Sequence, residues 1–479
     1  MISRVKRSSL DRKNREARSP PPVKSKTAEI RRHVSKIPDI RYEDQDAHSL
    51  TSFAGLVIFQ KLFQQLNLKA RLTRELAHLA GSATYGAAVV FLWLVVHLLL
   101  GFRRIRERDF YADDPLVLRV LGLAQLPDTS TICRTLAKFD QQAVDNLRNL
   151  MRQWVLERLV SESLARVTLD FDGSVFSTGR HAEGTAIGFN KKKKGARSYY
   201  PLFCTVAQTG QFFDLHHRSG NVHDSNGSLD FILDCVGEVR RALPAARIES
   251  RIDSAFFDEE RLVNMHLADV EFTVSVPFER FPQLKRQIEQ RQRWSRIDET
   301  WSYFETEWKP NKWTFGFRVL VVRQKKKQPT KGPLQLDLFR PVSHQYEYQV
   351  IMTNKKVLGA WGVIEFHHGR GSQEGIFAEG KTHCRMEYVP VGKWHGNQAY
   401  CLAALTAHNL TRELQMRATP RERGTRSKRP ALWTFETLGT LRGRVLRQAG
   451  RLIHPQGYLT LVVSRAKAFR KSLEKYLAA

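Results

Sequence analysis

Residues 49–160 carry apolar side chains at helical spacing. Phe59, Leu62, Phe63 and Leu66 recur at intervals of three and four residues. Such intervals place the apolar side chains on one face of a helix, which can then pack on a core. The pattern predicts a mostly helical N-terminal region.

Two short helices are expected near the end of this region. Asp114 precedes Pro115, which is typical of an N-cap followed by proline at the first helical position, and Asp128 precedes a second apolar stripe. Polar residues, among them Arg134, lie between the apolar positions of the second helix, as in a DNA-reading helix-turn-helix. The connector LGLAQLPD is longer than the usual turn, so an ordinary helical pair remains open.

From about residue 165 the apolar positions alternate or form short continuous runs, which is the pattern of strands. Strands and helices follow one another in the order expected of a mixed sheet covered by helices. The expected strands are 165–176, 200–207, 211–217, 247–253 and 271–276, and the expected helices are 227–242 and 259–267. Residues 277–353 are aromatic and β-rich, and the last hundred residues are mostly helical again.

The charge balance points to a polyanionic partner. The 77 Lys+Arg and 48 Asp+Glu give a formal net charge of +29. An excess of this size repels itself unless a polyanion neutralises it, most often nucleic acid. Two segments concentrate the charge, with 12 basic and 4 acidic residues in 1–40, and 10 basic and 2 acidic residues in 417–451. A ribosome-associated or merely soluble basic protein is the alternative.

Composition excludes several other classes. With 42% hydrophobic and 26% charged residues, the chain is neither disordered as a whole nor collagenous. The five cysteines never form a CxxC pair, which argues against a disulfide framework or a zinc knuckle and favours a reducing compartment. The apolar run at 85–102 has His97 near its middle, so we expect a buried core helix rather than a membrane span.

Three acidic residues are notable for their positions. Asp172 closes the predicted strand TLDFDGS, Asp253 closes RIESRIDSAFF, and Glu374 lies in HHGRGSQEGIFAEGKTH. In an open sheet, functional groups gather beyond the carboxyl ends of the strands. Asp170 projects from the same face as Asp172, so either could be the ligand. Asp172 is preferred because it is nearer the strand end, although any one of these acids alone could be a salt-bridge partner.

A stripe of five residues surrounds the glutamate. The spacing of His367, Arg370, Glu374, Phe377 and Lys381 alternates between three and four, which on a helix forms a single line. Four glycines in the same segment oppose a helix, each by up to about 1 kcal/mol relative to alanine. An exposed Arg–Glu pair without any chemical role is the alternative.

These motifs in this order resemble those of a known family. DFDGS, RIDSAFF and H-x2-R-x3-E-x6-K are similar to the signature of the DDE transposases of bacterial insertion sequences, specifically the IS4-like superfamily and within it the IS1380 family. Arg370, Glu374 and Lys381 match the third motif, whereas His367 stands where the family has tyrosine. Further likeness in GRHAEGTAIGFNKKKKGARSYYPLFC, HHRSGNVHDSNG and NQAYCLAALTAHNL extends the resemblance over about 165–410.

The resemblance implies an α/β fold with an RNase H-like mixed sheet, in which Asp172, Asp253 and Glu374 are the catalytic triad. The separation of 121 positions between the last two acids is too long for an ordinary connection, so a β-rich insertion domain is expected there. The expected parts are a basic disordered arm at 1–45, a helical DNA-binding domain at 46–162, the catalytic core at 163–276, the insertion at 277–353, the second part of the core with the glutamate helix at 354–415, and a basic helical region at 416–479.

Elementary chemistry predicts metal at such a triad. Three carboxylates brought within a few ångströms repel one another unless a cation neutralises them. Hard oxygen ligands suit Mg²⁺ or Mn²⁺, and two ions about 3.5 to 4 Å apart can activate a water or a 3′-hydroxyl and stabilise the leaving oxygen. Arg370 and Lys381 would hold nearby phosphates, and His367 could donate to one.

Weaker signals concern further DNA contacts. Lys192 and Lys193 belong to a run of four lysines on a predicted turn, which could follow a DNA backbone or simply be solvated. Trp301 in the insertion could stack on an extruded base, although core packing is the commoner fate of tryptophan.

The expected function is that of a DNA transposase, which binds terminal inverted repeats, cuts there with divalent metal and joins the freed 3′ ends to target DNA. Two ends must be held together, so at least a homodimer is expected, in the bacterial cytoplasm at the nucleoid and without a membrane partner. A nuclease of the same core that cuts without joining, and a catalytically silent DNA-binding regulator derived from a transposase, are the alternatives.

Overall fold

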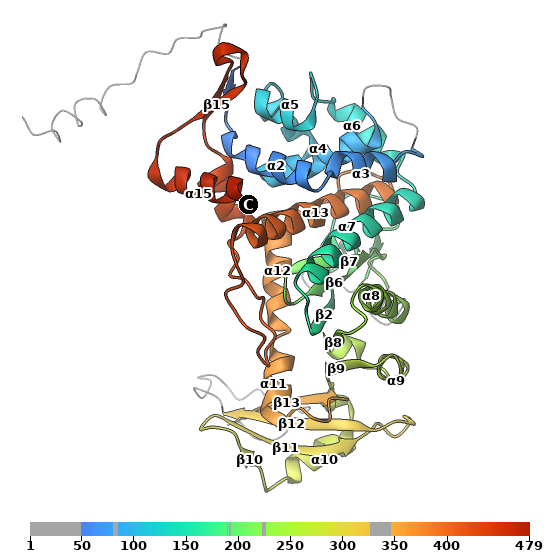
Figure 1. Ribbon diagram of the computed structural model, residues 1–479. Coiled ribbons are helices and arrows are strands. Elements are labelled where there is room, and N and C mark those ends of the chain that lie inside the picture. Colours follow the sequence, from blue (N-terminus) through green and yellow to red (C-terminus); the bar gives the residue numbers. More distant parts are fainter. Residues whose placement is uncertain (1–48, 80–84, 189, 191–192, 223–226, 326–345) are drawn as a thin grey trace, which may run out of the picture. The chain divides into compact units, whose positions relative to one another are not determined.

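The computed structural model in Figure 1 describes residues 49–79, 85–188, 190, 193–222, 227–325 and 346–479. The predicted basic arm at 1–45 and Lys192 lie outside the described residues. No single helix in these ranges is both long and apolar enough to cross a membrane. The helix Ala87–Leu100 and the 3₁₀ helix Ile105–Tyr111 meet that requirement only as a pair, which is bent by 72°.

The N-terminal region is helical, as its apolar spacing predicts. The apolar run forms α4, whose side chains from Val90 to Leu100 are all buried, so the prediction of a core helix is confirmed. His97 within it is 0% exposed, and burial lowers its pKa to about 3. The helices are α2 (Val57–Gln65), α3 (Leu68–Glu75), α4 (Ala87–Leu100), α5 (Pro115–Leu121), α6 (Thr129–Ala137) and α7 (Gln141–Ser161).

The two predicted N-caps differ in detail. Asp114 caps α5, since its side chain accepts hydrogen bonds from the backbone N–H groups of Leu116 and Val117. Asp128 holds the N-cap position of α6, but its side chain makes no capping hydrogen bond. Both helices therefore begin where the sequence indicates.

Nine strands form one mixed sheet in the order β10-β11-β12-β13-β9-β8-β2-β6-β7. At its centre β8 lies parallel to both β2 and β9, whereas the other neighbours are antiparallel. The strands are β2 (Arg166–Gly173), β6 (Leu202–Val206), β7 (Gln211–His216), β8 (Arg247–Ile252), β9 (Val270–Ser275), β10 (Ser295–Arg296), β11 (Trp301–Trp308), β12 (Phe317–Lys325) and β13 (Tyr346–Thr353).

Both faces of this sheet are covered, and β12 shows how the sequence arranges it. Val319 and Val321 belong to the core that also holds α8 (Ser228–Ala242), α9 (Glu259–Leu267) and α10 (Pro282–Gln290). Leu320 and Val322 belong to a separate core with α11 (Ala360–His368). Alternate residues of a strand point to opposite faces, so continuous apolar runs are required here.

The β-rich segment 277–353 does not form a sheet of its own. Its strand β13 pairs with β9 through Ile351 and Ser275, so β10 to β13 extend the central sheet. It also contains the helix α10, which begins at Pro282. Sequence periodicity identifies strands but not their partners, because pairing depends on residues far apart in the chain.

The prediction of a helical C-terminal region is wrong for its middle. Strands β14 (Gly450–Ile453) and β15 (Thr460–Val463) form a hairpin that pairs with β1 (Leu50–Thr51). The helical elements that follow α11 are α12 (Gly371–Thr382), α13 (Trp394–Ala418), α14 (Leu438–Leu441), the π-helical turn Arg442–Leu446 and α15 (Lys467–Ala478). A second small sheet has the order β3-β5-β4, from Phe176–Ser177, Arg197–Tyr199 and Ala186–Ile187.

Candidate active site at the carboxyl end of the central strands

Asp172 and Asp253 lie at the same edge of the sheet. In the parallel pair of β2 and β8, Asp170 is opposite Arg251. Each of the two candidate acids follows that pair by two residues, and neighbouring strands lie about 4.8 Å apart. Both aspartates are partly exposed, in contrast to the residues that precede them.

Local hydrogen bonds orient the two carboxylates. The backbone N–H of Gly173 donates to Asp172 Oδ1 at 2.8 Å. Asp253 is the N-cap of a 3₁₀ turn, and the N–H of Ala255 donates to its Oδ1 at 2.9 Å. Each bond occupies one carboxylate oxygen with a neutral donor.

Helix α12, whose first turn carries Glu374, docks on β2 next to this edge. The side-chain amide of Gln373, one residue earlier, donates to the backbone oxygen of Asp170 at 2.8 Å. Arg370, which precedes α12, has its Nη1 atom 3.5 Å from Asp172 Oδ2. Glu374 itself is exposed in the first turn of the helix. Asp172, Asp253 and Glu374 together form what we call the acid edge.

The predicted stripe from His367 to Lys381 is not one continuous helix. Helix α11 ends at His368, and α12 begins at Gly371. Gly369 lies in the break because a Cβ atom there would overlap the guanidinium of Arg251 and the backbone oxygen of Lys428. Gly369, one of the glycines that oppose a helix in the sequence, therefore permits a close approach of chain segments.

His367 does not face DNA, so the prediction of a phosphate contact is wrong. Its side chain is buried, with Nε2 2.8 Å from Ser275 Oγ and Nδ1 3.0 Å from Thr273 Oγ1. Burial, together with the nearby charges of His368, Arg370 and Arg251, lowers its pKa to about 3. The ring is neutral and has both nitrogens engaged within the protein.

The structure separates Asp170 from Asp172, which the sequence left open. Both oxygens of Asp170 accept from Arg251, at 2.6 Å from Nε and 2.5 Å from Nη2, and the pair is almost completely buried. Burial raises the pKa of Asp170, and the charge of Arg251 opposes that rise. Both oxygens of Asp170 are engaged by Arg251 inside the protein, whereas Asp172 is accessible.

A second buried carboxylate lies deeper on β8. Glu249 is 0% exposed and accepts from Lys355 at 2.6 Å, from Arg429 at 2.8 and 3.0 Å, and from Arg166 at 3.0 Å. Burial alone would raise its pKa, but the hydrogen bonds and charges of Arg429 and Lys355 outweigh it and bring the pKa to about 2. The ion pairs of Asp170 and Glu249 together form what we call the buried ion-pair layer.

The acid edge fits a hard cation by its chemistry but not by its present arrangement. Three carboxylates offer the oxygen ligands that Mg²⁺ and Mn²⁺ prefer. Across the described residues, however, no three Asp, Glu, His or Cys side chains lie close enough together to hold a metal ion. Arg370 instead supplies the positive charge next to Asp172.

The other residues predicted to contact DNA are dispersed. Lys381 lies near the end of α12, Lys193 is exposed before β5, and Arg134 is exposed on α6, far from α12 in Figure 1. Trp301 is half-buried at the start of β11, and its ring centroid lies 5.4 Å from that of His368. Of these residues, Lys381 lies on the same helix as Glu374, and Trp301 contacts His368 at the end of α11.

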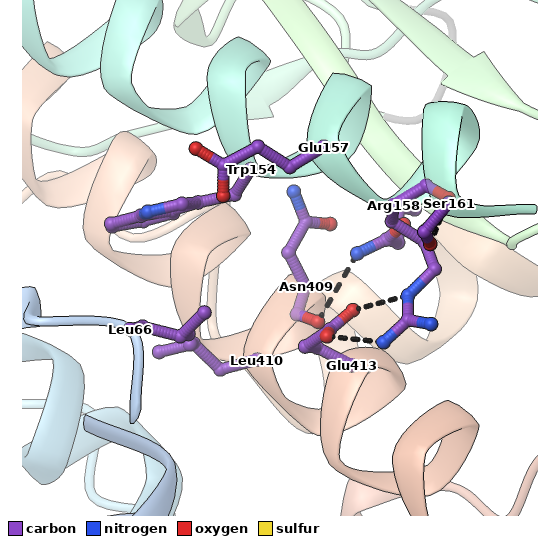
Figure 2. A pocket seen from close by; sticks show the side chains of 9 residues that line it. Leu66, Trp154, Glu157, Arg158, Ser161, Asn409, Leu410 and Glu413 are labelled. Atoms are coloured by element: carbon purple, nitrogen blue, oxygen red, sulfur yellow. Dashed lines mark hydrogen bonds and ion pairs between the residues drawn. The ribbon is translucent and has the colours of Figure 1, made fainter. Parts of the chain in front are cut away.

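A small cavity between α7 and α13 is separate from these residues. Figure 2 shows Arg158 and Glu413 facing each other there, with Arg158 Nε donating to Glu413 Oε2 at 2.9 Å. Its volume is about 80 Å³, and Trp154 and Leu410 also line it. None of the acid edge lines this cavity, and its ion pair is internally satisfied.

A mixed sheet with carboxylates at the end of its central strands defines an α/β protein with an acidic candidate site. The chain matches the family described as Transposase DDE domain group 1 over residues 36–479. Because that match spans nearly the whole sequence, the chain belongs to this family of DDE transposases. No curated protein matches the chain.

Two solved structures show distant similarity. A piggyBac transposase synaptic complex with hairpin DNA has 12% identity and a TM-score of 0.36, covering 81% of this chain and 79% of the other. A Mos1 transposase paired-end complex with left transposon end has 8% identity and a TM-score of 0.18, covering 52% and 66%. We draw no conclusion about this chain from similarities at these TM-scores.

Proposed function

We propose that this DDE transposase binds the terminal inverted repeats of a bacterial insertion sequence of the IS1380 family, cleaves the DNA there and joins the 3′ ends to a target. The observation that carries the proposal is the parallel register of β2 and β8, since it puts Asp172 and Asp253 at adjacent strand ends. The docking of α12 through Gln373 supports the inclusion of Glu374. The net charge of +29 suits a DNA substrate.

Asp172, Asp253 and Glu374 would hold Mg²⁺ or Mn²⁺, as two ions in an RNase H-like core. Such ions supply an activated water or 3′-hydroxyl and stabilise the leaving oxygen. Arg370 Nη1 lies 3.5 Å from Asp172 Oδ2, so a cation held by Asp172 would replace Arg370 as the positive charge next to this carboxylate. The freed guanidinium would then bind a phosphate of the substrate with two parallel hydrogen bonds.

The assembly and setting follow from the reaction. Two transposon ends must be joined in one complex, which calls for at least a homodimer. Substrate and target are both double-stranded chromosomal DNA, so we place the reaction in the bacterial cytoplasm at the nucleoid.

The test is a joining assay with Mg²⁺ on duplexes that carry the inverted repeats flanking the reading frame. We expect joined products from the wild-type chain and a loss of at least about 10³-fold in the Asp253→Asn variant. Joining by the variant at the wild-type rate would contradict the proposal. Products that are only hydrolysed would favour the nuclease, and DNA binding without any cleavage would favour the silent regulator.

A further inference from the structure

A basic loop follows α13 and lies beside the helices that carry the acid edge. Residues 420–432, called the basic strap, hold five basic residues and one glutamate. In Figure 1 the chain leaves α13, runs beside α12 towards α11 and returns. The sequence shows the charge of this segment but not its position, because its place depends on contacts with distant strands.

Backbone hydrogen bonds hold the strap against the rest of the protein. The N–H groups of Glu422 and Arg423 both donate to the oxygen of Leu432 at 3.0 Å, and the N–H of Leu432 donates to the oxygen of Gln208 at 2.8 Å. Leu432 is 2% exposed, so the returning limb is anchored in the core. The strap is therefore a fixed feature of the surface.

The tip of the strap is fastened to the buried ion-pair layer. Arg251 Nη1, on the guanidinium that pairs with Asp170, donates to the oxygen of Lys428 at 2.9 Å. Arg429 turns inward onto Glu249 with a positive φ of 47°. Gly369, which precedes Arg370, lies against Lys428, so the tip is next to the start of α12.

The remaining strap cations face solvent. Arg421 pairs with Glu162, and Arg423 donates to Thr434 Oγ1 at 3.1 Å. Arg426 and Lys428 are exposed, and neither side chain forms an ion pair in the part of the chain that the structure describes. Exposed like charges held close together repel one another, which a phosphate backbone would relieve.

We propose that Arg426 and Lys428 bind the phosphate backbone of duplex DNA next to the phosphodiester that reacts at the acid edge. The inference rests on the proposed function and adds a contact to it. Arg251 links the two sites, because one guanidinium holds both β2, which carries Asp172, and the tip of the strap. The strap positions DNA and takes no part in bond breaking.

The experiment is a salt titration of binding between the full-length protein and a fluorescent duplex of random sequence. Each phosphate that a cation of the protein neutralises contributes about 0.9 to the magnitude of the slope of log K against log [salt]. We expect the double variant Arg426→Gln/Lys428→Gln to reduce the slope by about 2, since it removes two such cations. The charge-conserving double variant Arg426→Lys/Lys428→Arg is expected to keep the wild-type slope.

A matched control removes the same charge elsewhere. Lys467 and Lys471 are exposed on α15, which packs against α2 and α13, and the double variant Lys467→Gln/Lys471→Gln is expected to leave the slope unchanged. An unaltered slope in the strap variant, an equal fall in the control, or a fall in the charge-conserving variant overturns the inference. A wild-type chain that binds no duplex at any salt concentration overturns the proposed function itself.

Discussion

The acid edge and the buried ion-pair layer meet on β2, where Asp172 and Asp170 are two residues apart, and the two regions differ in burial and in hydrogen-bond partners. Asp170 is buried and bound through both oxygens by Arg251, whereas Asp172 is 24% exposed and has Arg370 at 3.5 Å. A buried charge that loses its partner is strongly destabilising, whereas a partly exposed ion pair contributes little. We infer that the layer holds the strands together and that the edge is available for chemistry.

The largest effect on stability is expected in the layer. Arg251→Met leaves the charge of Asp170 buried without a partner and also frees the tip of the basic strap. The free energy of unfolding should fall by about 3 to 5 kcal/mol. Urea denaturation followed by circular dichroism measures it, and a change below about 1 kcal/mol would mean that the pair is not structural.

Glu249 is expected to make the free energy of unfolding fall as the pH falls, because its ion pairs are also buried. Its pKa is about 2 in the folded chain and 4.5 ordinarily, so its stabilising contribution is present above pH 4.5 and is lost as the pH falls towards 2. A shift of this size corresponds to roughly 3 kcal/mol. Unfolding measured from pH 6 to 2 should therefore show a weaker pH dependence in Glu249→Gln than in the wild type, and identical profiles would refute the role of Glu249.

The smallest effect is expected at the edge. Arg370→Gln removes an ion pair whose two side chains are 22% and 24% exposed. The free energy of unfolding should change by less than about 1 kcal/mol, because solvent screens such pairs. Thermal unfolding is a sufficient measurement, and a loss comparable to that of Arg251→Met would erase the distinction between edge and layer.

Local sequence patterns predict most of the central elements. The helix expected at 259–267 coincides with α9, and the strand expected at 247–253 is β8 with one residue fewer. Apolar periodicity predicts these elements because each of them buries one or both of its faces, and the buried faces appear in the sequence as regularly spaced apolar residues. The hairpin of β14 and β15 is not predicted, since its strands have four residues each and β14 pairs with β1 some 400 positions earlier.

The candidate site is predictable in part for a similar reason. The sequence pattern shows where a strand ends, so Asp172 and Asp253 could be predicted as site residues. It could not separate Asp170 from Asp172, because residues two apart on a strand point to the same face. Burial and hydrogen-bond partners come from distant segments, which explains why the predicted phosphate contact of His367 is wrong. The same limit hides the basic strap.

The most direct test of this division compares Asp170→Asn with Asp172→Asn in two assays, DNA joining with Mg²⁺ and urea unfolding. We expect Asp172→Asn to lose joining by at least about 10³-fold while its unfolding free energy stays within about 1 kcal/mol of the wild type. Asp170→Asn should lose about 3 to 5 kcal/mol of stability, because Arg251 is left buried and unpaired. Normal joining by Asp172→Asn, or wild-type stability of Asp170→Asn, would contradict the assignment of chemistry to the edge and of support to the layer.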